Sequence, residues 1–431
     1  MIRSILVFVA TWSLVAPAFA QSKFTDAQKI IRGGRTNGAD AVQGTAGSSA
    51  KAVAGAKAVF GKEPPVLLTK DELAAGWISL FDGQTFFGWK AHSEADWKVE
   101  NGAIVVTSGK PGLLCTTVQF DNYVVKADFR AAKGTNSGIF LRTAQVPAMQ
   151  DITTKCYELN IAAPDNPFPT GSLVGRKKYA EAGETDAWRS FEAIVDGPKV
   201  VIKLDGKDVL SYEDPKPSPR GYIGLQLNSG KCEFKNIKLQ PLGLKSIFNG
   251  KDLTGWSKPK GSLSEFTVTK DGELNVKNGR GCLESDGQYA DFVLQLECFS
   301  HAKNLNSGVF FRAIPGDNAN NGYESQIHNG FKDGDRAQPL DCGTGGIYRR
   351  INARRVVSND EEWFHKTVIA DGPHISVWVN GYQVTDWTDT RKPDKNPRNG
   401  LRLEKGTLQI QGHDPTTNLS FRNLKAKEIN K

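Results

Sequence analysis

The 431-residue sequence lacks the short motifs that mark several large enzyme classes. It has no G-x-x-x-x-G-K-[ST] phosphate-binding loop, no G-x-S-x-G nucleophile motif and no H-E-x-x-H zinc helix. It also has no C-x-x-C pair, so neither a redox motif nor a zinc site is indicated. No Lys/Arg cluster is interleaved with aromatic residues, and a net charge of +8 is mild for this length, so we expect no nucleic-acid partner.

Long apolar runs are also missing after the N-terminus, so we expect no transmembrane segment. At the N-terminus itself, Arg3 precedes an apolar core, Ile5–Val15, and an A-x-A cleavage motif ends at Ala20. This pattern predicts a secretory signal peptide over residues 1–20, cut before Gln21. The sequence therefore predicts a secreted or periplasmic protein.

An oxidising compartment would permit disulfides among the six cysteines, but the sequence does not define a disulfide framework. Three of the six cysteines lie in each half of the chain, and their spacing does not fix any pairing. We expect most of them to be buried thiols.

Helical periodicity is scarce. Residues 21–65 are rich in Ala and Gly and predict a flexible tether. Thr69–Glu72 is a capping box that predicts a short helix, Asp71–Ala75. The rest alternates apolar and polar residues in short segments, and pairs such as Asp205-Gly206 and Asn380-Gly381 favour two-residue hairpins. The chain is therefore expected to be all-β.

The segments recur in the same order in the two halves. Trp77–Trp89 resembles Leu244–Trp256, and the later segments match in turn. We therefore predict two copies of one domain, repeat 1 over residues 66–242 and repeat 2 over residues 243–431. A domain of this size made of short strands is a two-sheet sandwich or jelly roll, whose curved sheet makes a groove for an extended ligand.

Polar side chains share one face of three predicted strands in repeat 2. They comprise an arginine, a carboxylate, amides and two imidazoles, namely Asn306, Arg312, Glu324, Gln326, His328, Gln411 and His413. Tyr348 follows a glycine turn and joins the set. On neighbouring strands, such groups can remove a proton, return one and stabilise an oxyanion.

Each of these residues also has a structural alternative. A strand histidine is often a surface or hydrogen-bonded residue, and Tyr348 can be a packing aromatic. Arg312 and Glu324 can form a structural ion pair. Because an unpaired buried charge is unfavourable, the cluster either faces a solvent-filled groove or is paired internally.

Several sequence blocks resemble those of a known family. They are the opening block Ser246–Trp256, the phrase N-S-G-[IV]-F-[LF]-R in both repeats, Y-E-x-Q-I from Tyr323, T-G-G-I-Y from Thr344 and the closing F-R-N strand at Phe421. In this order they resemble the 3-keto-disaccharide hydrolase domain family. The resemblance covers both repeats, and it implies tandem concanavalin-like jelly-roll β-sandwiches.

The resemblance further implies a secreted enzyme that cleaves 3-keto-glycosides and 3-keto-disaccharides. A C3 ketone acidifies the C2 proton, so a base can remove it, the C1 oxygen leaves by elimination, and added water completes a net hydrolysis. His413 or His328 is the candidate base, and Tyr348 the candidate proton donor. The enolate would be stabilised by Arg312 or by a divalent metal ion held by Glu324 and a histidine.

The two repeats differ at the expected site. Repeat 1 keeps counterparts of Arg312, Glu324 and Gln411, namely Arg142, Glu158 and Gln226. Where repeat 2 has Gln326, His328, Tyr348 and His413, repeat 1 has Asn160, Ala162, Val174 and Asn228. We therefore expect chemistry in repeat 2. The substrate-binding set predicted across both repeats is Glu324, Gln326, Gln411, Asn306, Arg142, Glu158 and Gln226.

A non-catalytic carbohydrate-binding or envelope adhesion protein on the same fold is the alternative, because fold alone does not determine function. An enzyme needs a histidine within hydrogen-bond reach of the groove, whereas a lectin needs only stacking aromatics and amides. If chemistry occurs in repeat 2, we expect repeat 1 to bind sugar or to serve as a scaffold.

Overall fold

The computed structural model describes residues 63–64, 66–148, 151–183, 185–316 and 321–429. The predicted signal peptide (1–20) and nearly all of the predicted tether (21–65) lie outside these residues, so both stay predictions. Among the described residues, no helix combines the length and apolar character needed to cross a bilayer.

Helical structure is confined to short segments in the described chain. Helix α1 spans Lys70–Ala74, and a 3-10 turn, η2, spans Lys332–Gly334. The predicted capping box is confirmed: Oγ1 of Thr69 accepts from the N–H of Glu72, and the Glu72 carboxylate accepts from the N–H of Thr69. The helix begins one residue earlier than predicted, because Thr69 is the N-cap and Lys70 is therefore the first helical residue.

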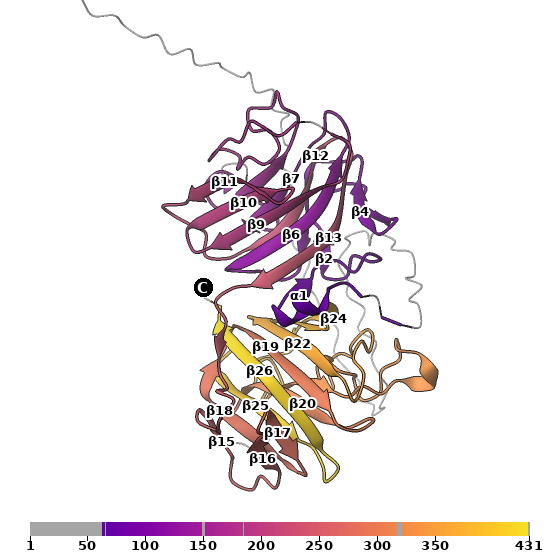
Figure 1. The fold of residues 1–431 in the computed structure, drawn as a ribbon, viewed down its shortest axis with the longest axis vertical. Coiled ribbons are helices and arrows are strands. Elements are labelled where there is room, and N and C mark those ends of the chain that lie inside the picture. The colour runs from indigo at the N-terminus through magenta and orange to yellow at the C-terminus, as the bar shows by residue number, and fades with distance from the viewer. Residues whose placement is uncertain (1–62, 65, 149–150, 184, 317–320, 430–431) are drawn as a thin grey trace, which may run out of the picture. The chain divides into compact units, whose positions relative to one another are not determined.

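The first half of the chain folds into a two-layered β-sandwich, called here the repeat-1 sandwich, in which all paired strands are antiparallel (Figure 1). One sheet has the order β11-β10-β9-β6-β13-β4-β3 with β1 on β13: β1 (Ile78–Ser79), β3 (Lys98–Glu100), β4 (Ala103–Val106), β6 (Tyr123–Ala131), β9 (Arg189–Asp196), β10 (Lys199–Leu204), β11 (Lys207–Glu213), β13 (Cys232–Pro241). The other has the order β2-β5-β12-β7-β8: β2 (Trp89–Ala91), β5 (Gly112–Thr116), β7 (Asn136–Thr143), β8 (Tyr157–Ile161), β12 (Tyr222–Ser229).

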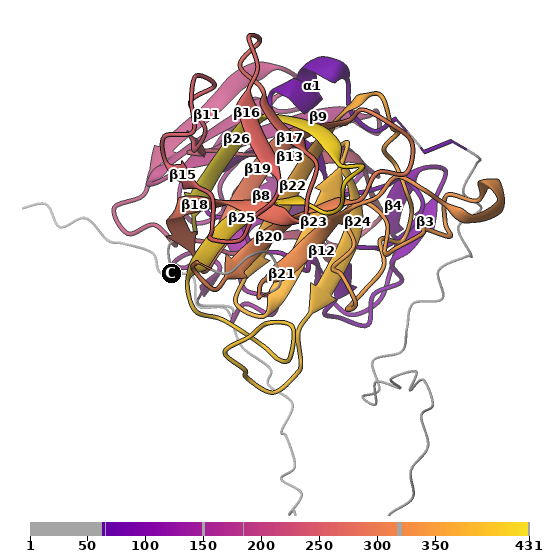
Figure 2. The same ribbon diagram turned by 90° about the horizontal axis from the view of Figure 1, so that it is seen from below.

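The second half repeats this topology strand for strand, as the repeat-2 sandwich. Its larger sheet has the order β16-β17-β26-β19-β22-β23-β24 with β14 on β26: β14 (Lys245–Ser246), β16 (Glu265–Val268), β17 (Leu274–Lys277), β19 (Phe292–Ser300), β22 (Trp363–Asp371), β23 (His374–Val379), β24 (Tyr382–Thr388), β26 (Asn418–Glu428). Its five-stranded sheet, seen across Figure 2, has the order β15-β18-β25-β20-β21: β15 (Trp256–Ser257), β18 (Gly281–Tyr289), β20 (Ser307–Ala313), β21 (Tyr323–Ile327), β25 (Gly406–Gly412).

The predicted all-β fold of tandem jelly-roll sandwiches is therefore confirmed. The two-residue hairpins are confirmed as well, since Asp205 and Gly206 have φ values of 51° and 78°, and Asn380 and Gly381 have values of 48° and 72°. Positive φ at both positions is the signature of the type I′ turn that matches strand twist. The exact boundaries at residues 66, 242 and 243 stay predictions.

The core of each sandwich lies between its two sheets. In repeat 2, Val309 and Ile410 of the five-stranded sheet belong to one buried apolar cluster with Val368 and Phe421 of the larger sheet. Because successive side chains of a strand point to opposite faces, the residues between these core positions project from the outer face of the five-stranded sheet. That outer face carries the candidate site.

Most of the cysteines are buried thiols, as expected from the sequence. All six lie in the described residues, and none of them forms a disulfide. Five are buried, whereas Cys342 is half-buried. Burial raises the pKa of Cys115 to about 12, as expected for a thiol that packs like a small apolar residue.

Candidate active site

Each sandwich has a pocket on the outer face of its five-stranded sheet. The repeat-2 pocket has a volume of about 220 Å³ and is lined by Arg280, Gly281, Asn306, Glu324, Gln326, Asp341, Tyr348, Arg398, Gln411, Gly412 and His413. It gathers all of the predicted site residues of repeat 2 except Arg312 and His328. The strand alternation used in the prediction therefore held over most of this sheet.

The floor of the repeat-2 pocket is built by β20, β21 and β25. Across β20 and β21, Phe310 pairs with Glu324 and Gly308 pairs with Gln326. Only glycine fits at position 308, because a Cβ there would lie 2.5 Å from Oε1 of Glu324. The N-S-G phrase of the sequence therefore leaves the space that the Glu324 carboxylate occupies.

Glu324 is paired with Arg398, an arginine that no sequence pattern had indicated. Nη2 of Arg398 donates to Oε2 of Glu324 at 2.8 Å, and the Glu324 side chain is 4% exposed. Cζ of Arg398 also lies 5.0 Å from the ring centre of Tyr348 and 5.2 Å from that of Phe310. Burial raises the pKa of Glu324, while Arg398 and His413 oppose this rise. The arginine is thus held between a carboxylate and two aromatic faces.

Asp341, a second residue missed from sequence, orders the amides of the pocket. Its Oδ2 accepts from Nδ2 of Asn306 at 2.5 Å and from Nε2 of Gln326 at 2.8 Å. Oδ1 of Asn306 and Oε1 of Gln326 are buried without a hydrogen-bond partner among the described residues. Because buried polar atoms are normally hydrogen-bonded, these two oxygens are positioned to accept from hydroxyl groups of a ligand.

His413 is the predicted histidine that lines this pocket. Its Nδ1 lies 2.8 Å from Oδ2 of Asp414, and its side chain is 42% exposed. Partial burial raises the pKa of Asp414, but hydrogen bonds from Thr416 and His413 outweigh it and lower that pKa overall. A carboxylate beside Nδ1 favours the tautomer with the proton on Nδ1, which leaves Nε2 as the basic nitrogen.

Tyr348 is placed beside β21 by the T-G-G-I-Y segment. Its N–H donates to the carbonyl of Glu324 at 3.0 Å, and the N–H of Gln326 donates to the carbonyl of Gly346 at 2.9 Å. Gly345 has a φ of 92°, and a Cβ there would lie 2.4 Å from a valine methyl group of the core. The two glycines therefore let this segment run along the outer edge of the sheet and deliver the tyrosine to the pocket.

Arg312 does not face the pocket, contrary to the prediction from strand alternation. Its strand has a register shift just after Phe310, and Arg312 has a φ of 47°. This bulge turns the side chain away, so that it is fully buried and donates to the carbonyls of Ala290 at 2.7 Å and Arg402 at 3.0 Å. The prediction that Arg312 holds an enolate is therefore wrong, and the arginine that lines the pocket near the carboxylate is Arg398.

Arg142 has the same geometry in repeat 1. It has a φ of 50° and donates to the carbonyls of Asp121 at 2.7 Å, Gly197 at 2.9 Å and Ser218 at 2.8 Å. Arg142 is buried and does not line the repeat-1 pocket. Its predicted substrate-binding role is therefore wrong as well: the two arginines are structural counterparts that tie loops to the end of the sheet.

His328 also lies outside the lining of the repeat-2 pocket. Its N–H donates to Oγ1 of Thr344 at 3.0 Å, and its Nδ1 accepts from the N–H of Gly330 at 3.2 Å. Burial lowers the pKa of His328. Of the two histidines that the sequence left open as bases, the geometry favours His413.

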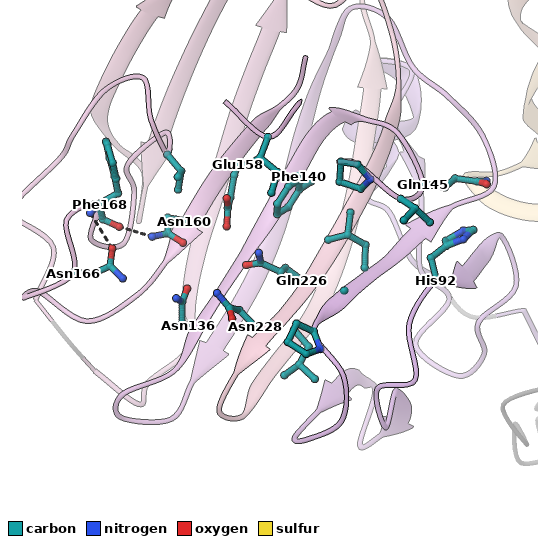
Figure 3. Close-up of a pocket in the computed structure, with 18 residues that line it drawn as sticks. His92, Asn136, Phe140, Gln145, Glu158, Asn160, Asn166, Phe168, Gln226 and Asn228 are labelled. Atoms are coloured by element: carbon teal, nitrogen blue, oxygen red, sulfur yellow. Dashed lines mark hydrogen bonds between the residues drawn. The ribbon is translucent and has the colours of Figure 1, made fainter. Parts of the chain in front are cut away.

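Figure 3 shows the residues that line the repeat-1 pocket. This pocket is larger than that of repeat 2, with a volume of about 520 Å³. The same strand pairings place Glu158, Asn160, Gln226 and Asn228 where the repeat-2 pocket has Glu324, Gln326, Gln411 and His413. The pocket also has apolar walls, which include Leu113, Phe140, Ile152, Phe168 and Val174. The predicted correspondence between the repeats is thus visible in two pockets of different character.

Within the described residues, Glu158 has no cationic partner like Arg398, since none of the lysines or arginines there lines the repeat-1 pocket. Burial raises the pKa of Glu158 to about 7, and a hydrogen bond from the Gln226 amide opposes only part of that rise. Near pH 7, repeat 1 therefore has a carboxyl group that is about half protonated where repeat 2 has a Glu–Arg pair.

A divalent metal ion held by Glu324 and a histidine was the alternative to an arginine for stabilising the enolate, and it stays a prediction. In the part of the chain that the structure describes, no group of three His, Cys, Asp or Glu side chains is arranged to hold a metal ion. In the repeat-2 pocket, Glu324 faces Arg398.

Comparison with known proteins places the chain in a family. The 3-keto-alpha-glucoside-1,2-lyase-like domain matches residues 76–240 and again residues 243–427. The chain belongs to this family. A 3-keto-disaccharide hydrolase from Bacteroides thetaiotaomicron is 30% identical over 105 residues, which cover 21% of this chain and 36% of that protein. The match thus spans about a third of that relative's length, and the resemblance to the family inferred from sequence is confirmed.

Solved structures match about one repeat's share of the chain. A Parabacteroides distasonis protein, whose name assigns it provisionally to the glycosyl hydrolases, is 22% identical over 41% of this chain and 98% of its own, with a TM-score of 0.36. The carbohydrate-binding module CBM66 from Bacillus subtilis is 16% identical to the present chain. The match covers 35% of the present chain and 94% of the module, with a TM-score of 0.29. At these values the likenesses carry no functional argument.

Proposed function

We propose that the chain cleaves glycosides whose sugar carries a ketone at C3, and that the repeat-2 pocket is where this occurs. Family membership supports the substrate class, which the name of the Bacteroides thetaiotaomicron relative also states for that protein. The pocket supports the chemistry, because it gathers His413, Arg398 and Tyr348 in one small polar cavity. The predicted signal peptide over residues 1–20 would place the activity in the periplasm or outside the cell.

In the first step His413 removes the C2 proton. A ketone at C3 acidifies this proton, because the electron pair left on C2 is delocalised onto the ketone oxygen. Nε2 is the accepting atom, since Nδ1 faces Asp414, whose carboxylate then stabilises the imidazolium that forms. General-base catalysis of this kind is worth roughly 10²–10⁴-fold in rate.

Arg398 stabilises the enolate oxygen on C3. Its ion pair with Glu324 and its contacts with aromatic rings hold the guanidinium in place before the substrate binds. A donor that is already oriented stabilises developing negative charge without reorganisation during the reaction. Glu324 therefore acts as the positioning partner of the arginine.

In the second step the enolate re-forms the ketone and expels the C1 oxygen by β-elimination. Tyr348 donates its phenolic proton to the leaving oxygen. Water then adds to C1 of the resulting enone, C2 regains a proton from His413, and the other proton of the water restores the tyrosine. The sum is a hydrolysis with no net redox change, and it does not need the two carboxylates of ordinary glycosidases.

One observation carries the proposal: the histidine, the tyrosine and the arginine line the pocket of only one of two matched sandwiches among the described residues. Asn228 and Val174 take the places of His413 and Tyr348 in the other pocket, which has no arginine. A purely structural cluster would be expected in both repeats, as the pair Arg142 and Arg312 is.

The direct test is release of 4-nitrophenol from 4-nitrophenyl 3-keto-β-D-glucopyranoside by the chain without its predicted signal peptide. We expect turnover by the wild type that is insensitive to a chelator, and its loss in His413→Ala but not in His328→Ala. Folding of each variant is checked by circular dichroism. A wild type that is inert with and without added divalent metal ions contradicts the proposal, and chelator sensitivity contradicts the role given to Arg398.

A further inference from the structure

The repeat-1 pocket retains features of a binding site although it lacks the proposed catalytic groups. Asn160 is 3% exposed, and its Oδ1 has no hydrogen-bond partner among the described residues, while its Nδ2 donates to the carbonyl of Phe168. Oε1 of Gln226 is likewise buried without a partner in this part of the chain. Unpaired buried acceptors are rare in folded proteins, so these two oxygens indicate a ligand that donates hydrogen bonds.

The polar groups are concentrated on one side of the cavity. Figure 3 shows Glu158, Asn160, Gln226, Asn136 and Asn228 projecting from the sheet into the same space. Amide groups donate hydrogen bonds through their N–H groups and accept them through their oxygens, and a carboxyl group can also do both when it is protonated. Together these side chains can therefore bind neighbouring hydroxyl groups of a ligand. This side of the pocket therefore suits one face of a sugar ring.

The remaining walls are mainly apolar, with the polar residues His92, Gln145 and Asn166 among them. Leu113, Phe140, Ile152 and Phe168 line the cavity, and Val146 stands at its rim with 71% of its surface exposed. The cavity volume of about 520 Å³ is more than twice the 220 Å³ of the repeat-2 pocket. The pocket therefore has room for a sugar together with an apolar substituent of similar size.

The pocket is also close to electrically neutral at neutral pH. Its titratable lining residues are Glu158 and His92, and no lysine or arginine is among them. Burial raises the pKa of Glu158 to about 7, and burial lowers the pKa of His92. An anionic ligand would find no cationic side chain among these lining residues and would face the partly ionised Glu158, so a neutral occupant is expected over an anionic one.

We propose that the repeat-1 pocket is a non-catalytic binding site for neutral glycosides that carry an apolar, preferably aromatic, aglycone. The sugar hydroxyls would bind the amides and Glu158, and the aglycone would lie against the apolar walls near Ile152 and Val146. This site is independent of the proposed chemistry in repeat 2, since it needs neither an oxidised sugar nor His413.

The test is isothermal titration calorimetry of the chain without its predicted signal peptide, with phenyl β-D-glucopyranoside as the probe. Because this glycoside has no C3 ketone, it is not a substrate of the proposed reaction. We expect methyl β-D-glucopyranoside, which lacks the apolar aglycone, to bind at least about tenfold more weakly. Phenyl β-D-glucuronide is expected to bind more weakly still at pH 8, where Glu158 is mostly ionised.

Two variants and one matched control locate the binding. Gln226→Leu removes an amide from the floor and is expected to weaken phenyl glucoside binding about tenfold or more. Val146→Asp, at an exposed rim position that does not endanger folding, is expected to weaken the phenyl but not the methyl glycoside. Gln411→Leu makes the equivalent change in repeat 2 and is expected to leave this affinity unchanged.

Three outcomes would overturn the proposal. The first is equal affinity for the phenyl and methyl glycosides, and the second is no binding at millimolar concentration. The third is a loss of binding in Gln411→Leu as large as in Gln226→Leu, which would assign the ligand to the repeat-2 pocket. None of these outcomes bears on turnover of the 3-keto substrate, so the two proposals fail separately.

Discussion

Two equivalent glutamates show how one scaffold supports two different sites. Glu158 of β8 and Glu324 of β21 follow matching tyrosines, and each pairs across its strand with a phenylalanine, Phe140 or Phe310. Burial raises the pKa of both carboxyl groups, yet only Glu324 has an arginine beside it. The partner of the carboxylate, and not the strand that carries it, therefore decides whether the pocket is neutral or ionic.

The cores of the two sandwiches also differ: repeat 1 has an apolar aromatic pair where repeat 2 has a thiol and a buried amine. In repeat 1, Phe129 and Phe191 stack with ring centres 4.5 Å apart. At the equivalent positions repeat 2 has Cys298 and Lys366, and Nζ of Lys366 donates to the carbonyls of Ser325 at 2.8 Å and Gln326 at 2.9 Å. Repeat 2 thus holds β21, the strand that bears Glu324, from below with a buried amine. The predictions that follow test how much of the difference between the repeats these groups explain.

The largest effect is expected from His413→Asn, which gives repeat 2 the residue that repeat 1 has at this position. Loss of the general base should lower turnover of a 3-keto-glucoside about a thousandfold. Steady-state kinetics of the wild type and the variant, measured side by side, checks this loss.

A histidine elsewhere in repeat 2 serves as the control. His301 lies in the described chain outside the pocket, with its Nε2 2.9 Å from Oγ of Ser420. His301→Asn should leave turnover within about twofold of wild type, since such a substitution touches no reacting group. Equal loss in both variants would show that His413→Asn acts through folding and not through chemistry.

Arg398→Met should have the next largest effect, because it removes the cation that faces the developing enolate. We expect turnover to fall about 300-fold, within the range for losing one oriented oxyanion donor. Arg398→Lys should recover only part of this, because an ammonium lacks the planar fork that engages Glu324. A change in KM with unchanged kcat would instead assign Arg398 to substrate binding alone.

Repeat 1 has Val174 at the position of Tyr348 and so lacks its hydroxyl group. Tyr348→Phe removes only this hydroxyl group from repeat 2 and therefore tests its role as the proton donor. A poor leaving group such as methanol or a second sugar needs protonation, whereas 4-nitrophenolate leaves without it. We therefore expect about a hundredfold loss with a 3-keto-disaccharide but less than about threefold with the nitrophenyl substrate. Equal losses with both substrates would exclude the tyrosine as the proton donor.

The fold and most of the site were accessible from the sequence because they follow from strictly local rules. Asp-Gly and Asn-Gly pairs fixed hairpins, and two-residue alternation placed Glu324, Gln326 and His413 on the correct face. The repeats then supplied an internal check, since Glu158 and Gln226 reappear at the matching positions of the other pocket.

The sequence-based prediction of the site failed where side chains no longer alternate between the two faces of a strand. The bulge at Arg312 reverses the face of one residue, and a positive φ at an arginine is not visible in the sequence pattern. Arg398 and Asp341 lie in segments between strands, where periodicity gives no direction to a side chain. Arg142 could have warned of the error. An arginine kept in both repeats, including the one that lacks counterparts of His413 and Tyr348, is better explained by structure than by catalysis.

Lys366→Met tests the buried amine beneath β21. Burial lowers the pKa of Lys366 to about 7, so between pH 7 and 10 the unfolded chain binds a proton that the folded chain does not. Wild-type stability should therefore gain on the order of 3 kcal/mol relative to the variant as the pH rises through this window. Urea unfolding at several pH values measures the difference, with Lys303→Met, at an exposed lysine, as the control. A difference that does not change with pH would show that the amine is not charged differently in the two states.

Glu158→Gln should have the smallest effect and the opposite pH dependence. The folded chain holds the proton on Glu158 up to about pH 7, whereas an unfolded glutamate releases it near pH 4.5, so wild-type stability declines as the pH rises between these values. The amide variant avoids this penalty, and we expect it to be more stable than wild type by on the order of 2 kcal/mol at pH 8 and by nothing at pH 4. Glu213→Gln, at an exposed glutamate, should show no such trend. If Glu158→Gln is neutral at both pH values, the carboxylate has a cationic or solvent partner in solution, and the contrast with the Glu324–Arg398 pair disappears.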